Sequence, residues 1–153
     1  MRVIVAVVGR PRNAVLAAAI EDYETRAARY WPLDVHEVRE ERAAAIASSV
    51  VRAREGARLR ETVGAARLVA CTEGGKTFSS QAFSEWLRNE RDMSRDVAFV
   101  IGGAFGLSDE IVSAASMKLS LAPWTLPHEL ARLVLAEQLY RAGSIVRGEP
   151  YHK

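Results

Sequence analysis

The sequence has a single cysteine and no long apolar run, and each absence excludes a class of protein. Among its 153 residues only Cys71 carries a thiol. One cysteine cannot form an intrachain disulfide or a cysteine-rich zinc site, so we expect a reducing, cytoplasmic setting and no metal. The apolar run 3–8 is too short for a signal-peptide core and far too short to cross a membrane. We therefore expect a soluble chain with no membrane partner.

An excess of charge of either sign is also missing. The chain has 21 Lys and Arg against 19 Asp and Glu, a formal net charge of +2. This balance permits a nucleic-acid partner, but dedicated nucleic-acid-binding domains carry denser basic patches. Linkers, repeats and low-complexity tracts are absent as well. A chain of this length is expected to form a single domain over residues 1–153.

What the sequence does contain is a regular alternation of apolar runs with helical patterns. β-branched apolar runs predict strands, and apolar residues at helical spacing predict helices. The expected strands are 2–8, 33–39, 67–72, 97–101 and 117–122. The expected helices are 14–30, 40–63, 79–91, 108–116 and 127–146. The pattern predicts an α/β fold, with a mostly parallel sheet and helices on both faces.

Three details of this pattern carry further expectations. The segment 33–39 alternates apolar and polar residues, which is typical of a half-exposed strand at or near a sheet edge. Gly56 is a point at which the charged helix 40–63 could divide in two, and Gly74-Gly75 is expected to end the strand 67–72. The charged face of that helix is expected to face solvent.

The last helix is apolar on more than one face. Its apolar residues are Leu130, Leu133, Val134, Leu135, Leu139, Ile145 and Val146. These cannot all point at one sheet, so the second face needs another partner. A homodimer interface supplies one, and burial between other elements of the same chain is the alternative.

A glycine-rich turn follows the strand 97–101. Gly102, Gly103 and Gly106 stand where a parallel strand ends, which is where open α/β sheets bind ligands. The spacing is not that of a dinucleotide fingerprint, and Asp109 and Glu110 would repel a pyrophosphate at the start of the next helix. A ligand that carries positive charge would be tolerated there. An ordinary tight turn is the competing interpretation.

A second strand-end loop, 123–128, precedes the last helix. It reads Pro-Trp-Thr-Leu-Pro-His, and its two prolines limit its freedom, so its backbone could form a rigid wall that reads an adenine-like edge. The alternative is a structural loop with Trp124 in a core. Cys71, at the end of its strand, is interpreted as a small apolar wall residue rather than a nucleophile.

The chain ends with Tyr151, His152 and Lys153, an aromatic ring, an imidazole and a cation. Such a segment could fold over a pocket and hold a nucleobase through stacking and charge, or it could be a disordered basic end. Upstream, Arg141 stands four residues after Glu137, which predicts an ion pair on the helix.

Four motifs in this order resemble one family. They are Ile101-Gly102-Gly103 with Gly106-Leu107-Ser108, then Thr125-Leu126-Pro127-His128, then 135–142 (Leu-Ala-Glu-Gln-Leu-Tyr-Arg-Ala), then Pro150-Tyr151-His152. The chain is similar over its whole length to the ribosomal large-subunit methyltransferase H family of the SPOUT (α/β-knot) superfamily. The resemblance implies a C-terminal trefoil knot, a homodimer, S-adenosylmethionine as cofactor, and methylation of N3 of a pseudouridine in 23S ribosomal RNA within the assembled 70S ribosome.

The resemblance also assigns residues. It places the cofactor on Cys71, on the glycine-rich turn with Gly102, Gly103 and Gly106, and on the loop Ala122, Pro123, Trp124, Thr125, Leu126 and Pro127. It brings Tyr151, His152 and Lys153 to the substrate base. Phe105 and Glu129 depart from residues common in the family, so the pocket rim is expected to differ.

The residue chemistry is compatible with that assignment. N3 of a pseudouridine must lose its proton before it attacks a methyl group, and His152 is the candidate base. Lys153 or Arg141 would stabilise the developing anion. Candidate RNA contacts are Arg10, Arg12, Lys76 and Arg147.

Two other functions remain open from the sequence. The alternating pattern alone also allows a nucleotide-cofactor enzyme of flavodoxin-like or Rossmann type, which would need a phosphate-binding turn. A non-catalytic, ribosome-associated dimer could have kept the same fold.

Overall fold

The computed structural model describes residues 1–42 and 45–152. Its strands are β1 (Val3–Val8), β2 (Leu33–Val38), β3 (Arg67–Lys76), β4 (Val97–Ile101) and β5 (Met117–Leu119). Its helices are α1 (Ala14–Ala27), α2 (Ser48–Val63), α3 (Ser80–Asp92), α4 (Asp109–Ala114) and α5 (His128–Val146). In the described ranges no helix is long and apolar enough to cross a membrane.

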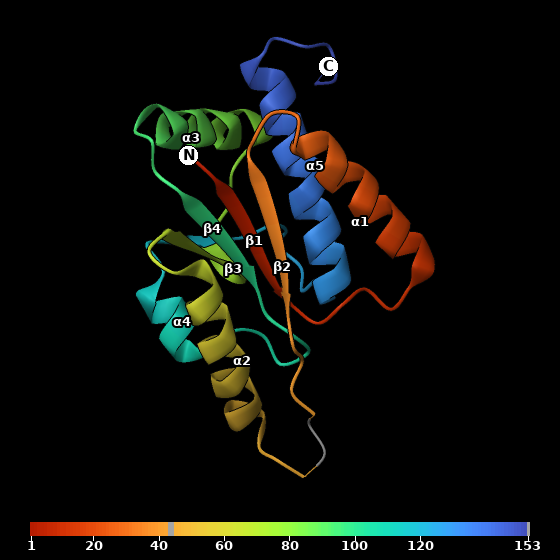
Figure 1. Ribbon diagram of the computed structural model, residues 1–153, viewed down its shortest axis with the longest axis vertical. Helices are drawn as coiled ribbons and strands as arrows, with labels where there is room; N and C mark the ends of the chain where they lie inside the picture. The colour runs from red at the N-terminus through yellow and green to blue at the C-terminus, as the bar shows by residue number, and fades with distance from the viewer. Residues whose placement is uncertain (43–44, 153) are drawn as a thin grey trace.

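The strands form one parallel sheet in the order β2-β1-β4-β3-β5. Both faces of β1 are buried, because helices cover the sheet on two sides (Figure 1). Val3, Val5 and Val7 pack with residues of α1, α3 and α5, whereas Ile4, Ala6 and Val8 pack with α2 and α4. The predicted α/β architecture with helices on both faces is confirmed, as is the edge position of β2.

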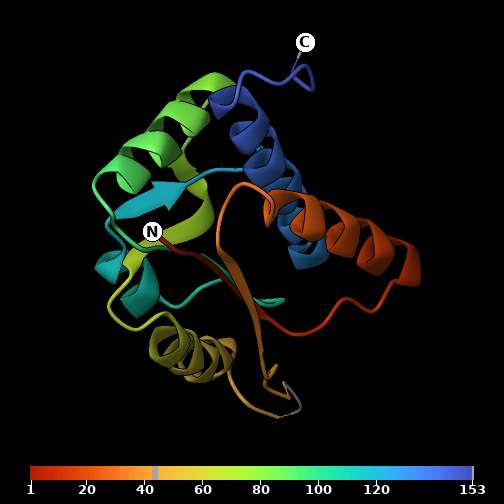
Figure 2. The same ribbon diagram turned by 45° about the horizontal axis from the view of Figure 1, so that its top comes forward.

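α5 lies between two other helices on its side of the sheet. It packs against both α1 and α3, as the turned view in Figure 2 also shows. Arg132, at 7% exposure, is bound there by Glu24 of α1 and Glu37 of β2 at 2.7 Å each. Burial within the same chain therefore accounts for much of the apolar surface of α5, although Leu130, Leu133 and others remain partly exposed.

The second predicted helix is wrong in its start. It begins at Ser48 rather than at residue 40, and residues 43 and 44 of the prediction lie outside the described residues. Nor does Gly56 divide it. A Cβ at Gly56 would lie 2.4 Å from Ser108 Oγ, so the glycine is required by the close approach of α2 to the start of α4.

The third strand is longer and the fifth shorter than predicted. β3 continues through Gly74-Gly75 to Lys76, and a Cβ on Gly75 would lie 2.6–2.7 Å from the Leu119 and Lys118 backbone. A side chain there would block the contact between β3 and β5. The fifth strand ends at Leu119 rather than at residue 122, and α1 ends at Ala27, with a turn continuing to Tyr30.

Candidate functional site

A cavity of about 430 Å³ opens at the carboxyl ends of β3, β4 and β5. This volume is within the range of small-molecule sites. From β3 it is lined by Cys71, Thr72 and Glu73; from the turn after β4 by residues 101–107; and otherwise by Val112, Leu121, Ala122, Trp124, Thr125, Leu126, His128 and Ala131. The two strand-end loops that the sequence singled out therefore do meet in one pocket.

The glycine-rich turn is held tightly closed. Gly103 and Gly106 form an isolated bridge, in which the Gly106 N–H donates to the Gly103 carbonyl at 3.0 Å. Gly106 has φ +78°, a conformation that favours glycine. A Cβ on Gly102 would lie 2.5–2.7 Å from the backbone of Gly106 and Leu107. This turn is therefore a cradle of backbone that a side chain would fill.

The loop before α5 forms the opposite wall. Thr125 Oγ1 donates to a Glu73 carboxylate oxygen, which ties the loop to β3, and Ser120 Oγ donates to the Ala122 carbonyl at 2.8 Å. Trp124 is 77% exposed, so it lies at the rim rather than in a core. Pro123 and Pro127, predicted to bind the cofactor, do not line the cavity.

Cys71 lies in the cavity wall and packs against the main hydrophobic core. Burial raises the pKa of its thiol to about 12, so the thiol stays protonated. A protonated, buried thiol is a poor nucleophile. The position is consistent with the apolar wall that the sequence suggested.

The carboxylates near the cavity are not those that the sequence named. Asp109 and Glu110 are exposed in the first turn of α4 and do not line it. Glu73 does line it, and Glu55 of α2 lies behind Gly103, with Oε2 3.0 Å from the position of a Gly103 Cβ. Sequence reasoning missed Glu55, because a glutamate in a strongly charged helix looks solvent-facing; its neighbour Gly56 was the available signal of close packing.

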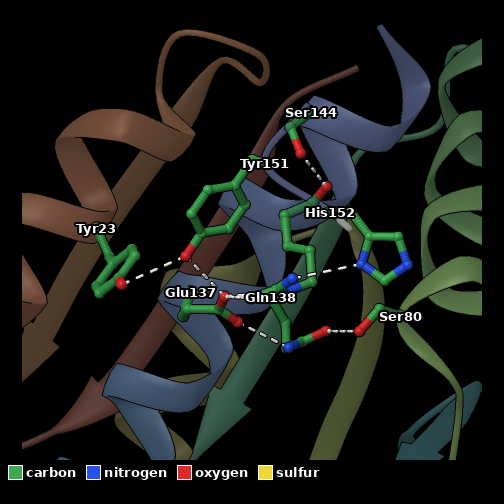
Figure 3. A network of polar contacts seen from close by, with 8 residues as sticks. Tyr23, Ser80, Glu137, Gln138, Ser144, Tyr151 and His152 are labelled. Atoms are coloured by element: carbon green, nitrogen blue, oxygen red, sulfur yellow. Dashed lines mark hydrogen bonds and ion pairs between the residues drawn. The ribbon is translucent and has the colours of Figure 1, made fainter. Parts of the chain in front are cut away.

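At the other end of α5 the chain terminus folds back onto the helix. Figure 3 shows the Tyr151 ring above α5, with its hydroxyl 3.1 Å from Glu137 Oε1 and 3.4 Å from the Tyr23 hydroxyl. The Arg141 guanidinium lies 4.7 Å from the centre of the Tyr151 ring. Burial and these hydrogen bonds raise the pKa of Tyr151 above its usual range. One turn further along α5, Ser144 Oγ donates to the Arg141 carbonyl at 2.9 Å (Figure 3).

His152 is held beside the same arginine. Its Nδ1 lies 3.3 Å from an Arg141 guanidinium nitrogen, and Arg141 Nε donates to Glu137 Oε1 at 2.9 Å. The predicted ion pair of Arg141 with Glu137 is confirmed. The structure thus brings together three of the four predicted catalytic residues, Arg141, Tyr151 and His152, whereas Lys153 lies outside the described residues.

Within one chain, however, these residues do not reach the cavity. His128 at the start of α5 lines the cavity, whereas Tyr151 and His152 pack further along the same helix, at Glu137 and Arg141 (Figure 3). Glu137 lies nine residues after His128, which is about 14 Å along the helix axis. Among the described residues of a single subunit the tail therefore does not line the cavity, and the meeting of tail and cofactor loops stays a prediction.

The candidate RNA contacts also divide between the two ends. The side chains of Arg10 and Arg12 follow β1 at the cavity end and are 87% and 78% exposed. Lys76 lies 4.6 Å from the Phe78 ring. Arg147 lies at the far end, 4.8 Å from the Tyr30 ring and bonded to the Arg29 carbonyl.

Comparison with known proteins gives consistent results. The family described as predicted SPOUT methyltransferase matches residues 1–152. Among curated proteins, ribosomal RNA large subunit methyltransferase H of Gemmatimonas aurantiaca is 59% identical, with 100% of both chains covered. The protein of the same name from Anaeromyxobacter sp. (strain K) is 44% identical, also over 100% of both chains. Among solved structures, a probable methyltransferase from Bordetella pertussis Tohama I shares the fold, with a TM-score of 0.54 at 14% identity over 92% of this chain and 95% of that one.

Proposed function

Because the chain belongs to the SPOUT methyltransferase family, and within it to the ribosomal RNA large subunit methyltransferase H proteins, we propose that it methylates N3 of a pseudouridine in 23S ribosomal RNA. The observation that carries this assignment is 59% identity along the whole chain. The family brings with it the α/β knot, in place of a flavodoxin-like or Rossmann fold. The substrate is the assembled 70S ribosome, which places the reaction in the cytoplasm.

The methyl donor is S-adenosylmethionine, and the cavity at the strand ends fits it. Its described lining includes a carboxylate, Glu73, and neither Lys nor Arg. A pyrophosphate would need cationic or helix-terminal donors, whereas a sulfonium is favoured by a neutral to negative wall. The backbone cradle at Gly102 and the wall from Ala122 to Leu126 would hold the donor, which supplies an electrophilic methyl group. Cys71 would contribute apolar contact.

The active site needs a second subunit. In one chain Tyr151 reaches α5 only as far as Glu137, about 14 Å along the helix axis from His128 in the cavity wall. In a two-fold dimer the same surface meets itself, so residues from one end of α5 can face those from the other end. Partly exposed apolar side chains on α5, including Leu133 and Ile145, would form part of that interface. The tail of one subunit would then complete the cavity of its partner.

The chemistry asks for a proton acceptor and for charge stabilisation. N3–H lies between two carbonyls; His152 takes the proton, and the N3 lone pair attacks the methyl carbon as the carbon–sulfur bond breaks. Lys153 and Arg141 stabilise the negative charge that develops on the base before attack. Tyr151 positions the base by stacking. Most of the rate enhancement comes from placing N3 in line with the breaking bond.

The substrate is tested by following incorporation of labelled methyl groups into 70S ribosomes and into free 23S RNA from cells that lack the enzyme. We expect incorporation into ribosomes, at the pseudouridine N3, and little into free RNA. No incorporation into either, despite donor binding, would instead support a non-catalytic ribosome-associated dimer.

Mixed dimers test the shared site. A chain that lacks residues 151–153 keeps its cavity, and a Gly102→Ala chain keeps its tail; neither homodimer should be active. After the two are unfolded and refolded together, the mixed dimer contains one intact site, so activity should return. If each tail served its own subunit, mixing would restore nothing.

A further inference from the structure

Glu55 is a buried carboxylate that the proposed mechanism does not use. It lies in α2 and is 2% exposed. One oxygen, Oε1, accepts the Glu41 backbone N–H at 2.9 Å. Within the described residues the other oxygen, Oε2, has no hydrogen-bond partner. Buried charges are normally paired, so this oxygen requires an explanation.

The unpaired oxygen faces the wall of the donor cavity. A Cβ on Gly103 would lie 3.0 Å from Oε2 and 3.4 Å from Oε1, and Gly103 itself lines the cavity. The carboxylate is thus separated from the cavity by the backbone of one glycine. The next residue, Gly56, packs against Ser108 at the end of the same turn, which fixes α2 on the turn.

The cations near Glu55 on its own helix are bound to another carboxylate. Arg58 is bound to Glu41 and to the Arg39 carbonyl, and Arg54 also pairs with Glu41. Glu55 also lines a neighbouring hollow of about 560 Å³, together with Arg42 and with Arg12, which pairs with Glu40. Burial, followed by the nearby carboxylates, raises the pKa of Glu55. When it is ionised, the Glu55 carboxylate therefore makes the electrostatic potential at the adjacent cavity wall more negative.

We propose that Glu55 is a specificity-determining residue of the donor site, whose carboxylate acts through the Gly103 wall to favour the positively charged donor over the neutral thioether product. This inference rests on the proposed function. Methyl transfer removes the positive charge from the ligand, so an interaction that depends on this charge is lost at the moment the product forms. At an effective dielectric constant of about 20, two unit charges separated by one backbone layer interact strongly enough to change affinity about tenfold or more. Glu55 would thereby assist product release.

Calorimetric binding of S-adenosylmethionine and S-adenosylhomocysteine to the dimer tests this inference, without any need for turnover. The variant is Glu55→Gln, which keeps the size and the Oε1 acceptor. At pH 8.5 we expect the ratio of product Kd to donor Kd to fall about tenfold in the variant, mainly through weaker donor binding. The matched control is Glu90→Gln. Glu90 is also 2% exposed, and its Oε2 also lacks a hydrogen bond within the described residues, but its carboxylate pairs with Arg67 and Arg95 at the opposite end of the sheet. Its ratio should equal that of the wild type.

A pH series gives a second readout on the unmodified protein. Because burial raises the pKa of Glu55, its charge is lost at a higher pH than that of an ordinary glutamate, and donor preference should increase as the pH rises. His128 and Glu73 also line the cavity, but both are present in Glu55→Gln, so the pH dependence that the variant lacks belongs to Glu55.

The possible outcomes distinguish a failure of the proposed function from a failure of the role proposed for Glu55. If the wild type binds neither ligand, the proposed function itself fails. If it binds them but Glu55→Gln weakens both equally, or leaves the ratio unchanged, Glu55 is merely structural and the inference is wrong. Should the variant fail to fold, a ratio that does not vary with pH in the wild type would also overturn it.

Discussion

The two ends of α5 present different chemical groups. We call the end that begins with His128 the binding end, and the end that carries Arg141 and the tail the chemical end. At the end that begins with His128, the wall is largely backbone, with glycines at the closest contacts and few charged side chains. At the other end, the ring centres of Tyr140 and Tyr151 lie 4.5 Å apart, and the Arg141 guanidinium contacts both Glu137 and His152. Backbone gives a rigid shape that recognises a ligand, whereas titratable side chains can move protons. The comparison suggests that donor binding and base chemistry are divided between the two ends, and between two subunits.

The largest effect on turnover is expected from removing the tail, residues 151–153, at the chemical end. Deleting residues 151–153 removes the candidate base, so turnover should fall about 100- to 10,000-fold. Donor affinity should stay within about twofold, since this segment lies away from the cavity of its own subunit. Methyl incorporation into ribosomes and calorimetry measure the two quantities. Arg60→Gln, which changes an exposed cation of α2 but leaves the tail, is the control. Equal losses in both would show that the tail belongs to donor binding.

The converse change should damage the binding end alone. A Cβ in Gly102→Ala would meet backbone atoms at 2.5–2.7 Å, which cannot move without opening the turn. We expect donor affinity to fall about 100-fold or more, and turnover with it. Gly74→Ala is a matched control, because a Cβ there meets nothing within 4 Å. Calorimetry on both variants is sufficient, and an unchanged affinity in Gly102→Ala would mean that the donor binds elsewhere.

A change where the turn after α1 packs on α5 should lower turnover without lowering donor affinity to the same extent. A Cβ in Gly143→Ala would lie 2.2–2.6 Å from the Tyr30 ring and its Cβ, atoms near the backbone that cannot swing aside. Overpacking of this kind costs about 1–3 kcal/mol. Chemical denaturation should show this loss of stability, and turnover should fall by more than donor affinity does. A larger loss in donor affinity would contradict the division.

The strands and loops that form the two ends could be predicted from the sequence, but their positions relative to one another could not. β1 and β4 were readable from β-branched runs, and both cavity loops from glycine and proline at strand ends. Gly56 and Gly75 were misinterpreted, because glycine usually interrupts an element, whereas here each allows two backbones to approach closely. The distance from the tail to the cavity depends on which end of α5 each occupies in the fold. Spacing along the chain gives the length of that helix but not the direction in which the tail folds back onto it, and it could not indicate a knot either.

The smallest effect concerns stability at the binding end. The folded-state pKa of Glu55 is raised by burial, so its contribution to stability is favourable at low pH and is lost as the pH rises through that value. Glu55→Gln removes a charge whose burial opposes folding, and should therefore raise the melting temperature at pH 8.5 by about 2–4 °C. At pH 5 calorimetry should find a smaller gain, because lowering the pH favours the protonated carboxyl, and Glu90→Gln should show no such gain because its carboxylate is paired with Arg67. A more stable protein with weaker donor binding would show that this buried charge is kept for function, and a variant destabilised at both pH values would show that Glu55 serves the fold instead.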